Sequence, residues 1–148
     1  MSRDGLSLGE ELRILDALHR YCFAIDERDA DSWLDCFTED GSFGLRASRD
    51  GEWVFRVAGS AELRAWFADY DLRATHANHV ILNPRIVTEG DAARAESYYL
   101  ILRADDGPLV PLRTGRYSDE LRRCSDGVWR LVNRIAWVDL GGRGAPVR

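Results

Sequence analysis

The sequence of 148 residues contains no lysine, and all 20 of its lysine-or-arginine positions are arginine. A catalytic lysine that forms a Schiff base is therefore excluded, and so is a phosphate-binding loop with its obligatory lysine. Residues 5–9 match the pattern G-x-S-x-G, but residues 1–4 in front of them show no strand pattern, which the nucleophile elbow of an α/β-hydrolase requires. The glycine-rich segment 141–144 does not lead from a strand into a helix, as a dinucleotide-binding loop must. These absences favour chemistry without a cofactor.

Cysteine and histidine are also scarce, with three residues of each type. Cys22, Cys36 and Cys124 are widely spaced and form no C-x-x-C pair, which is typical of reduced thiols rather than of a disulfide framework or a zinc site. His76 and His79 stand three residues apart, but no H-E-x-x-H motif or Cys/His cluster supplies the other ligands of a zinc ion. We therefore expect no metal.

No apolar run approaches the ~18 residues of a membrane-spanning helix, and residues 1–5 lack the apolar stretch of a signal peptide. The net charge of −5 opposes binding to nucleic acid or to an anionic membrane, since both attract a clustered basic face. With 45% hydrophobic and 30% charged residues, the composition is that of an ordinary globular protein. We expect a cytoplasmic protein with one domain over residues 1–148, a core over residues 8–140 and a frayed tail over residues 141–148.

The first half of the chain carries the patterns of helices. Apolar residues recur in steps of three and four over residues 8–26, which predicts an amphipathic helix. A short second helix, capped by Asp31 and Ser32, is expected to include Phe37. Ser60 is the expected N-cap of a third helix.

Strand patterns dominate the rest of the chain and are separated by turn residues. The expected strands cover residues 42–45, 52–57, 79–87, 92–103, 109–123 and 128–139. Helices followed by a run of long strands predict an α+β fold with a mainly antiparallel sheet, rather than alternating βαβ units. A curved sheet that closes over a helix leaves a funnel in which a pocket forms readily.

Several local strings resemble the SnoaL-like group of the NTF2-like superfamily. They are residues 21–29 (YCFAIDERD) with Trp33 and residues 37–41 (FTEDG), then residues 79–84 (HVILNP), residues 115–121 (GRYSDEL) and residues 126–131 (DGVWRL). Their order and spacing cover residues 12–139. The resemblance implies a cone-shaped, cystatin-like α+β roll of the kind found in scytalone dehydratase, hexachlorocyclohexane dehydrochlorinase and bile acid dehydratase, with about three helices on a curved sheet of about six strands.

The resemblance also implies a catalytic site. A tyrosine and an aspartate at the end of the first helix face a histidine from the sheet, and these positions are Tyr21, Asp26 and His79. Arg134 matches an arginine position of some members. An Asp–His pair in a dry pocket is a competent general base, while a tyrosine or an arginine stabilises developing negative charge. By strict strand alternation Arg134 lies opposite Trp129, so it faces the pocket only if the Trp129 side is the outer one.

The expected substrate is a hydrophobic, cyclic or aromatic small molecule, because aromatic side chains gather on the elements around the mouth and wall of the cone. The predicted substrate-binding residues are Phe43, Trp53, Phe55, Trp66 and Tyr98. Alternation places Tyr98 and Tyr99 on opposite sides of their strand, so only one of the two lines the pocket.

The sequence therefore predicts a cofactor-independent lyase or isomerase, with dehydration or a related elimination as the specific reaction, in secondary metabolism or catabolism. One alternative is a non-catalytic ligand-binding or dimerisation module, and another is the small subunit of a ring-hydroxylating oxygenase, whose fold is similar. We expect a homodimer that pairs through the outer face of its sheet. Arg113, Arg122 and Arg130 are expected on that face or in solvent.

Overall fold

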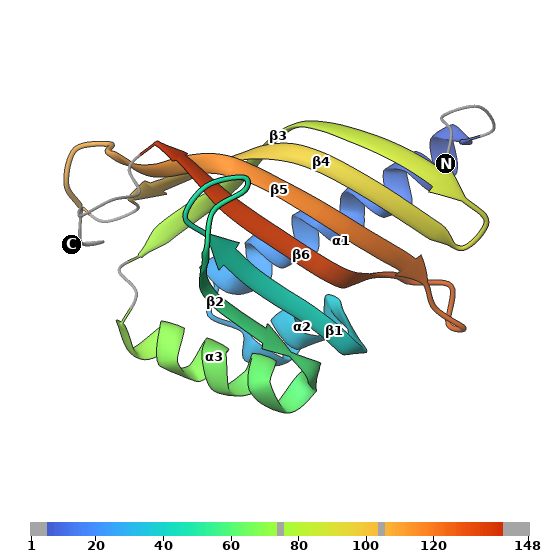
Figure 1. The fold of residues 1–148 in the computed structure, drawn as a ribbon, viewed down its shortest axis with the longest axis horizontal. Coiled ribbons are helices and arrows are strands. Elements are labelled where there is room, and N and C mark those ends of the chain that lie inside the picture. Colours follow the sequence, from blue (N-terminus) through green and yellow to red (C-terminus); the bar gives the residue numbers. More distant parts are fainter. Residues whose placement is uncertain (1–5, 74–75, 104–105, 141–148) are drawn as a thin grey trace.

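The computed structural model describes residues 6–73, 76–103 and 106–140, so the expected tail 141–148 lies outside the described residues. Three helices and six strands follow one another along the chain (Figure 1). They are α1 (Leu8–Asp26), α2 (Ala30–Asp35), β1 (Phe37–Arg46), β2 (Trp53–Ala58), α3 (Gly59–Arg73), β3 (Ala77–Glu89), β4 (Ala92–Arg103), β5 (Pro111–Arg123) and β6 (Trp129–Leu140). The α+β class and the mainly antiparallel sheet are confirmed.

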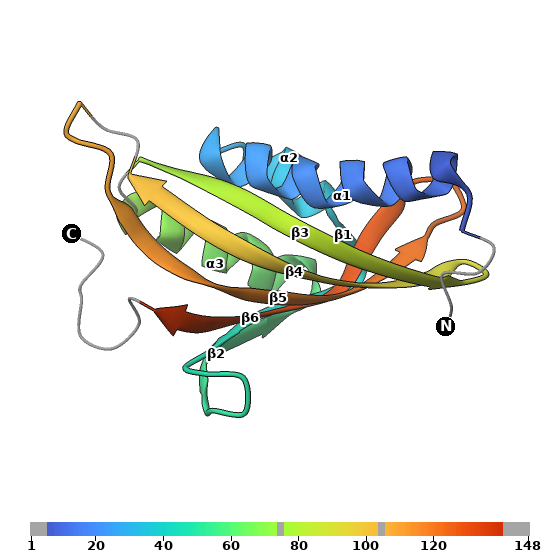
Figure 2. The same cartoon turned by 90° about the horizontal axis from the view of Figure 1, so that it is seen from above.

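One six-stranded sheet has the order β2-β1-β6-β5-β4-β3. All neighbouring strands are antiparallel except β1 and β6, which run parallel. Helix α1 lies along one face of the twisted sheet, and α3 packs at the end formed by β1 and β2 (Figure 2). No helix among the described residues is long and apolar enough to cross a membrane.

Helix α1 has the bounds that its apolar period predicts. The Ser7 hydroxyl caps its first turn by accepting a hydrogen bond from the backbone N–H of Glu10 at 3.2 Å. Ile14 and Leu18 on its apolar face are fully buried in the core, whereas Leu8 and Leu12 in its first turns are 73% and 57% exposed. The helix ends at Asp26, and this end is the part of α1 that supplies the site described below.

Helix α2 differs from the prediction at both ends. Asp29, rather than Asp31 or Ser32, is the N-cap, and its carboxylate accepts hydrogen bonds from the Ser32 backbone N–H at 3.1 Å and from the Ser32 hydroxyl at 2.6 Å. Phe37 is not helical, because it begins β1 and pairs with Leu131 of β6. Tertiary strand pairing here overrides the local helical pattern.

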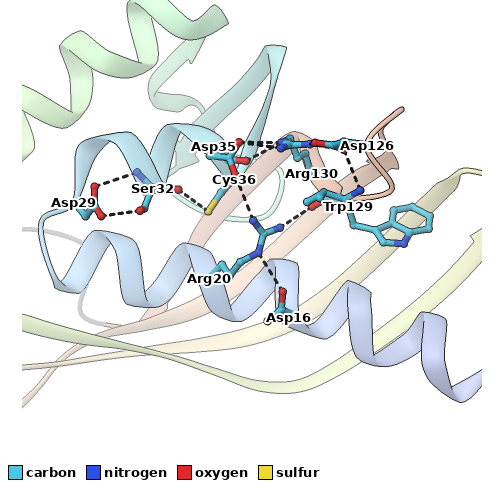
Figure 3. Close-up of polar contacts among 10 residues, drawn as sticks. Asp16, Arg20, Asp29, Ser32, Asp35, Cys36, Asp126, Trp129 and Arg130 are labelled. Carbon is cyan, nitrogen blue, oxygen red and sulfur yellow. Dashed lines mark hydrogen bonds and ion pairs between the residues drawn. The ribbon is translucent and has the colours of Figure 1, made fainter.

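Arginine side chains tie α1 and α2 to the first residues of β6 (Figure 3). Arg130 forms ion pairs with Asp35 at 2.9 Å and with Asp126 at 2.8 Å. Arg20 donates a hydrogen bond to the backbone carbonyl oxygen of Trp129 at 2.9 Å. Arg130 is therefore not in open solvent, since its side chain is only 15% exposed and is held by contacts within the chain.

A β-bulge in β6 decides which side of the sheet its later residues face. Consecutive residues of β5 pair with Leu131 and with Asn133, so Val132 is an extra residue in β6. The extra residue shifts the alternation by one position, and Arg134 turns to the same inner face as Trp129 and Leu131. Arg134 is consequently fully buried, which strict alternation does not predict.

Candidate active site

A cavity of about 290 Å³ lies between the helices and the inner face of the sheet. This volume is close to the lower end of the ~300–1,000 Å³ that small-molecule sites span. Aromatic rings form most of its wall: Tyr21, Phe43, Phe55, Trp66, Tyr70, Tyr99 and Tyr117. Ile25, Leu45, Ile101 and Ala136 complete the apolar lining, and His79 and Arg113 are the remaining lining residues described. The cavity suits a flat, hydrophobic molecule.

Asp26 and His79 are in direct contact at this cavity. The Nδ1 atom of His79 lies 2.5 Å from Oδ1 of Asp26, and the two side chains are 7% and 14% exposed respectively. The Asp26 carboxylate also accepts the backbone N–H of His79, at 2.9 Å to Oδ2 and 3.1 Å to Oδ1. Three contacts therefore join the last residue of α1 to the start of β3.

This arrangement selects the tautomer of the imidazole ring. A carboxylate can only accept hydrogen bonds, so an ionised Asp26 requires the proton of a neutral His79 to sit on Nδ1. The other ring nitrogen, Nε2, then carries a free lone pair. Since His79 lines the cavity, that lone pair is available to a bound molecule as a general base.

Behind the cavity wall lies a buried ion pair clamped between two tyrosine rings. Arg134 Nε and Nη2 each donate to a carboxylate oxygen of Asp119 at 2.8 Å, and both side chains are 0% exposed. The guanidinium carbon lies 4.1 Å from the ring centroids of both Tyr21 and Tyr117. Arg134 thus contacts the tyrosines that line the cavity and is not among the described lining residues itself.

Burial controls the ionisation of this group of side chains. Burial raises the pKa of the Tyr21 hydroxyl, and Arg134 opposes this rise only in part. Burial likewise raises the pKa of the Tyr117 hydroxyl well above its ordinary value. For Arg134, burial acts to lower the pKa, but the charge and hydrogen bonds of Asp119 outweigh it and the pKa of the guanidinium is raised. The tyrosines are therefore hydrogen-bond donors and the arginine is a fixed cation across the physiological range.

Residues 7–135 match the SnoaL-like domain. This chain belongs to the SnoaL-like domain family. Among solved structures, a protein of unknown function from Mycobacterium tuberculosis is 30% identical to this SnoaL-like protein, with a TM-score of 0.76 over 88% of this chain and 72% of that chain. A Nostoc punctiforme protein of unknown function with a cystatin-like fold is 25% identical, with a TM-score of 0.79 over 93% of this chain and 97% of that one.

A third similar structure contains a small molecule. It is a protein from Catenulispora acidiphila in complex with S-DNPA, 23% identical, with a TM-score of 0.73 over 90% of this chain and 96% of that one. No protein of curated function matches this SnoaL-like chain significantly. The cystatin-like, NTF2-like fold expected from the local strings is confirmed by these structures.

The predicted aromatic residues divide into two groups. Phe43, Phe55 and Trp66 line the cavity of this SnoaL-like domain. Trp53 does not, because a bulge makes Val54 an extra residue of β2 and turns Trp53 to the outer face, where its ring lies 4.3 Å from the Arg46 guanidinium.

Tyr98 also lies outside the cavity, so its predicted place in the lining is wrong. Its side chain is 41% exposed and its ring lies 4.9 Å from the guanidinium of Arg116. The neighbouring Tyr99 takes the inward position, as alternation requires, and its hydroxyl donates to the carbonyl oxygen of Trp137 at 3.2 Å. Burial raises the pKa of Tyr99 to about 12.

Two lining residues that the sequence reasoning missed come from β5. Tyr117 is buried, and Arg113 was expected on the outer face or in solvent but lines the cavity. The strand period of two is the signal that could have found them. Arg113, Gly115 and Tyr117 share one face of β5, so placing any one of them inside places the other two there. Arg122, in contrast, is exposed and pairs with Asp40 at 3.3 Å.

Nothing in the described residues supports a metal centre. His76 is exposed, and no group of three or more histidine, cysteine, aspartate or glutamate side chains gathers in residues 6–73, 76–103 and 106–140. His79 is held by Asp26 instead.

Because Tyr21 and Tyr117 are buried, the stability of the protein is expected to fall in alkaline solution. Above about pH 10 the unfolded chain loses its tyrosine protons while the folded chain keeps those of Tyr21 and Tyr117, so unfolding becomes more favourable as the pH rises. Each such tyrosine contributes a fall of about 1.4 kcal/mol per pH unit. Urea unfolding of wild type and of Tyr117→Phe between about pH 10 and pH 12 measures this slope. Tyr117→Phe is expected to have a slope of the free energy of unfolding against pH that is smaller by one tyrosine's contribution. An unchanged slope would contradict the raised pKa assigned to Tyr117.

Proposed function

We propose that this protein is a cofactor-independent lyase or isomerase that abstracts a proton from a hydrophobic small molecule, with His79 as the general base and Asp26 as its partner. The contact of 2.5 Å between Asp26 and His79 at an aromatic cavity carries this proposal. The relative from Catenulispora acidiphila, which holds a small molecule on the same fold, supports a small ligand for the cavity.

The proposed reaction begins when Nε2 of His79 accepts a proton from a carbon next to a carbonyl group. Negative charge then develops on the carbonyl oxygen, and the hydroxyl groups of Tyr21 and Tyr117 at the cavity wall are the donors proposed to stabilise it. In a dehydration, the electron pair of the broken C–H bond forms a C=C bond as a hydroxyl group leaves from the next carbon. That hydroxyl takes the proton back from His79 and departs as water, which returns the base to its starting state.

Arg134 has an indirect part in this scheme. Its charge lies against the faces of both tyrosine rings, 4.1 Å from each centroid, so it stabilises electron density on rings that contact the substrate. It is a positioning residue rather than a group that touches the reacting atoms.

The test measures proton abstraction directly. The protein is incubated with α-tetralone, a bicyclic ketone, in deuterium oxide, and the exchange of the hydrogens next to the carbonyl is followed by NMR. We expect wild type to accelerate exchange and His79→Gln to remove the acceleration, because glutamine has no basic nitrogen. His76→Gln is the matched control, since His76 is exposed and stands outside the cavity.

A different result favours a non-catalytic, ligand-binding role for the cavity. If α-tetralone binds to wild type but exchange is no faster than with His79→Gln, the general-base proposal fails. The protein is then a ligand-binding module that keeps the SnoaL-like fold without the chemistry.

A further inference from the structure

Among the described residues that line the aromatic cavity, one side chain is a permanent cation. Arg113 is that residue, and within the part of the chain that the structure describes no acidic residue lines the cavity and no ion pair or hydrogen bond engages the Arg113 side chain. The other buried arginine of the region, Arg134, is already held by both oxygens of Asp119. Arg113 is therefore a half-buried charge that no carboxylate of residues 6–73, 76–103 and 106–140 neutralises.

Strand register places Arg113 in line with the proposed base. His79 of β3 pairs with Ile101 of β4, and Ile101 pairs with Arg113 of β5. Directly paired residues point to the same face of a sheet, and all three of these residues line the cavity. Neighbouring strands lie about 4.8 Å apart, so the backbones of His79 and Arg113 are separated by about 10 Å across the cavity wall.

We propose that the substrate is an aromatic or polycyclic carboxylate whose acid group pairs with Arg113 while its reacting carbon lies at His79. The contact of the reacting carbon with His79 rests on the proposed function. The contact of the acid group with Arg113 does not, because it can be tested by binding alone. It narrows the substrate class from any hydrophobic molecule to a hydrophobic anion.

The chemistry of the two ends favours this orientation. The guanidinium group has a fork of N–H donors that matches the two oxygens of a carboxylate, and such pairs are strengthened where aromatic walls limit the access of water. At the other end, the base is accompanied by the negative charge of Asp26, which repels an anionic group from His79. A carboxylate therefore settles at Arg113, and the apolar ring fills the space between the two residues.

The test compares two probes that differ by one charge. Naphthylacetate carries a carboxylate, and naphthylacetamide is its neutral counterpart of nearly the same size. Their dissociation constants are measured by isothermal titration calorimetry at low salt. We expect wild type to bind naphthylacetate about 10-fold more tightly than the amide, which is the size of one charge-assisted hydrogen-bonded contact at a partly exposed site.

Variants of Arg113 assign this preference to one side chain. Arg113→Met keeps the length of the chain and is expected to bind both probes equally, and Arg113→Lys is expected to restore part of the preference. Arg116→Met is the matched control, because Arg116 lies on the same strand but is exposed and contacts Tyr98. Unchanged binding of the amide by Arg113→Met shows that the cavity is intact.

The proposal is overturned if wild type binds the two probes equally, or if Arg113→Met keeps the full preference for naphthylacetate. Failure of the proposed function gives a different pattern. In that case neither wild type nor any variant accelerates proton exchange, while wild type still prefers naphthylacetate and Arg113→Met still loses that preference. Anion recognition and base catalysis are thus tested separately.

Discussion

Asp26→Asn is expected to lower turnover by about 10²–10⁴-fold, the usual contribution of a positioned general base. Asparagine keeps an acceptor oxygen for the backbone N–H of His79, so the link between α1 and β3 survives. Its NH₂ group, however, is a donor that favours the tautomer of His79 with Nδ1 unprotonated and the proton on Nε2. The ring then presents an N–H group to the cavity instead of a lone pair.

The expected signature is loss of rate with retention of fold and binding. Turnover in the deuterium-exchange assay, the dissociation constant of α-tetralone and the thermal midpoint are measured together. Asp16→Asn is the matched control on the same helix, where the carboxylate is 69% exposed and pairs with Arg20 at 3.2 Å. Wild-type turnover in Asp26→Asn would falsify the role assigned to this carboxylate.

Asp119→Ala is expected to cost about 3–5 kcal/mol of the free energy of unfolding, because it leaves the Arg134 charge buried without its partner. The two tyrosine rings that contact the guanidinium do not replace a carboxylate with two hydrogen bonds at 2.8 Å. Urea unfolding followed by circular dichroism measures the change. Because a typical domain has only about 5–15 kcal/mol in total, the variant is expected to be partly unfolded at physiological temperature.

A double variant separates lost pairing from lost packing. Asp119→Leu combined with Arg134→Met removes both charges and fills the space with apolar atoms, so it is expected to recover most of the stability that Asp119→Ala loses. Asp126→Ala removes a half-exposed carboxylate and leaves Arg130 paired with Asp35, so it is expected to have a much smaller effect. If Asp119→Ala is no worse than Asp126→Ala, the buried pair does not contribute as the structure implies.

Local patterns were sufficient for most of the fold. The three-and-four spacing of apolar residues in α1 and the turn residues between the long strands have direct physical causes within a few residues, so these elements were predicted nearly to their ends. The end of α2 was not predicted correctly, because Phe37 belongs to a strand that forms by pairing with Leu131, far away in the sequence. A pairing of that kind leaves no mark in the nearby sequence.

In the candidate site, too, some residues were predicted from the sequence and others were not. The strings that resemble SnoaL-like proteins pointed to Asp26 and His79, which the structure brings into contact. The faces of Trp53 and Arg134 were beyond a simple period of two, because a bulge inserts one residue next to each of them, Val54 after Trp53 and Val132 before Arg134. Arg113 follows the simple period and was missed because no neighbouring residue had been placed inside first.

The parallel pairing of β1 with β6 bears on how the protein folds. Strand β1 has β6 as its partner on the side toward the centre of the sheet, and β6 is formed by the last described part of the chain (Figure 1). The hydrogen bonds between β1 and β6 therefore form only after the chain through β6 is present. Such a high contact order predicts slow folding, with the aromatic face of β1 exposed until β6 arrives. During synthesis, that interval is when the chain is most open to aggregation and to chaperones.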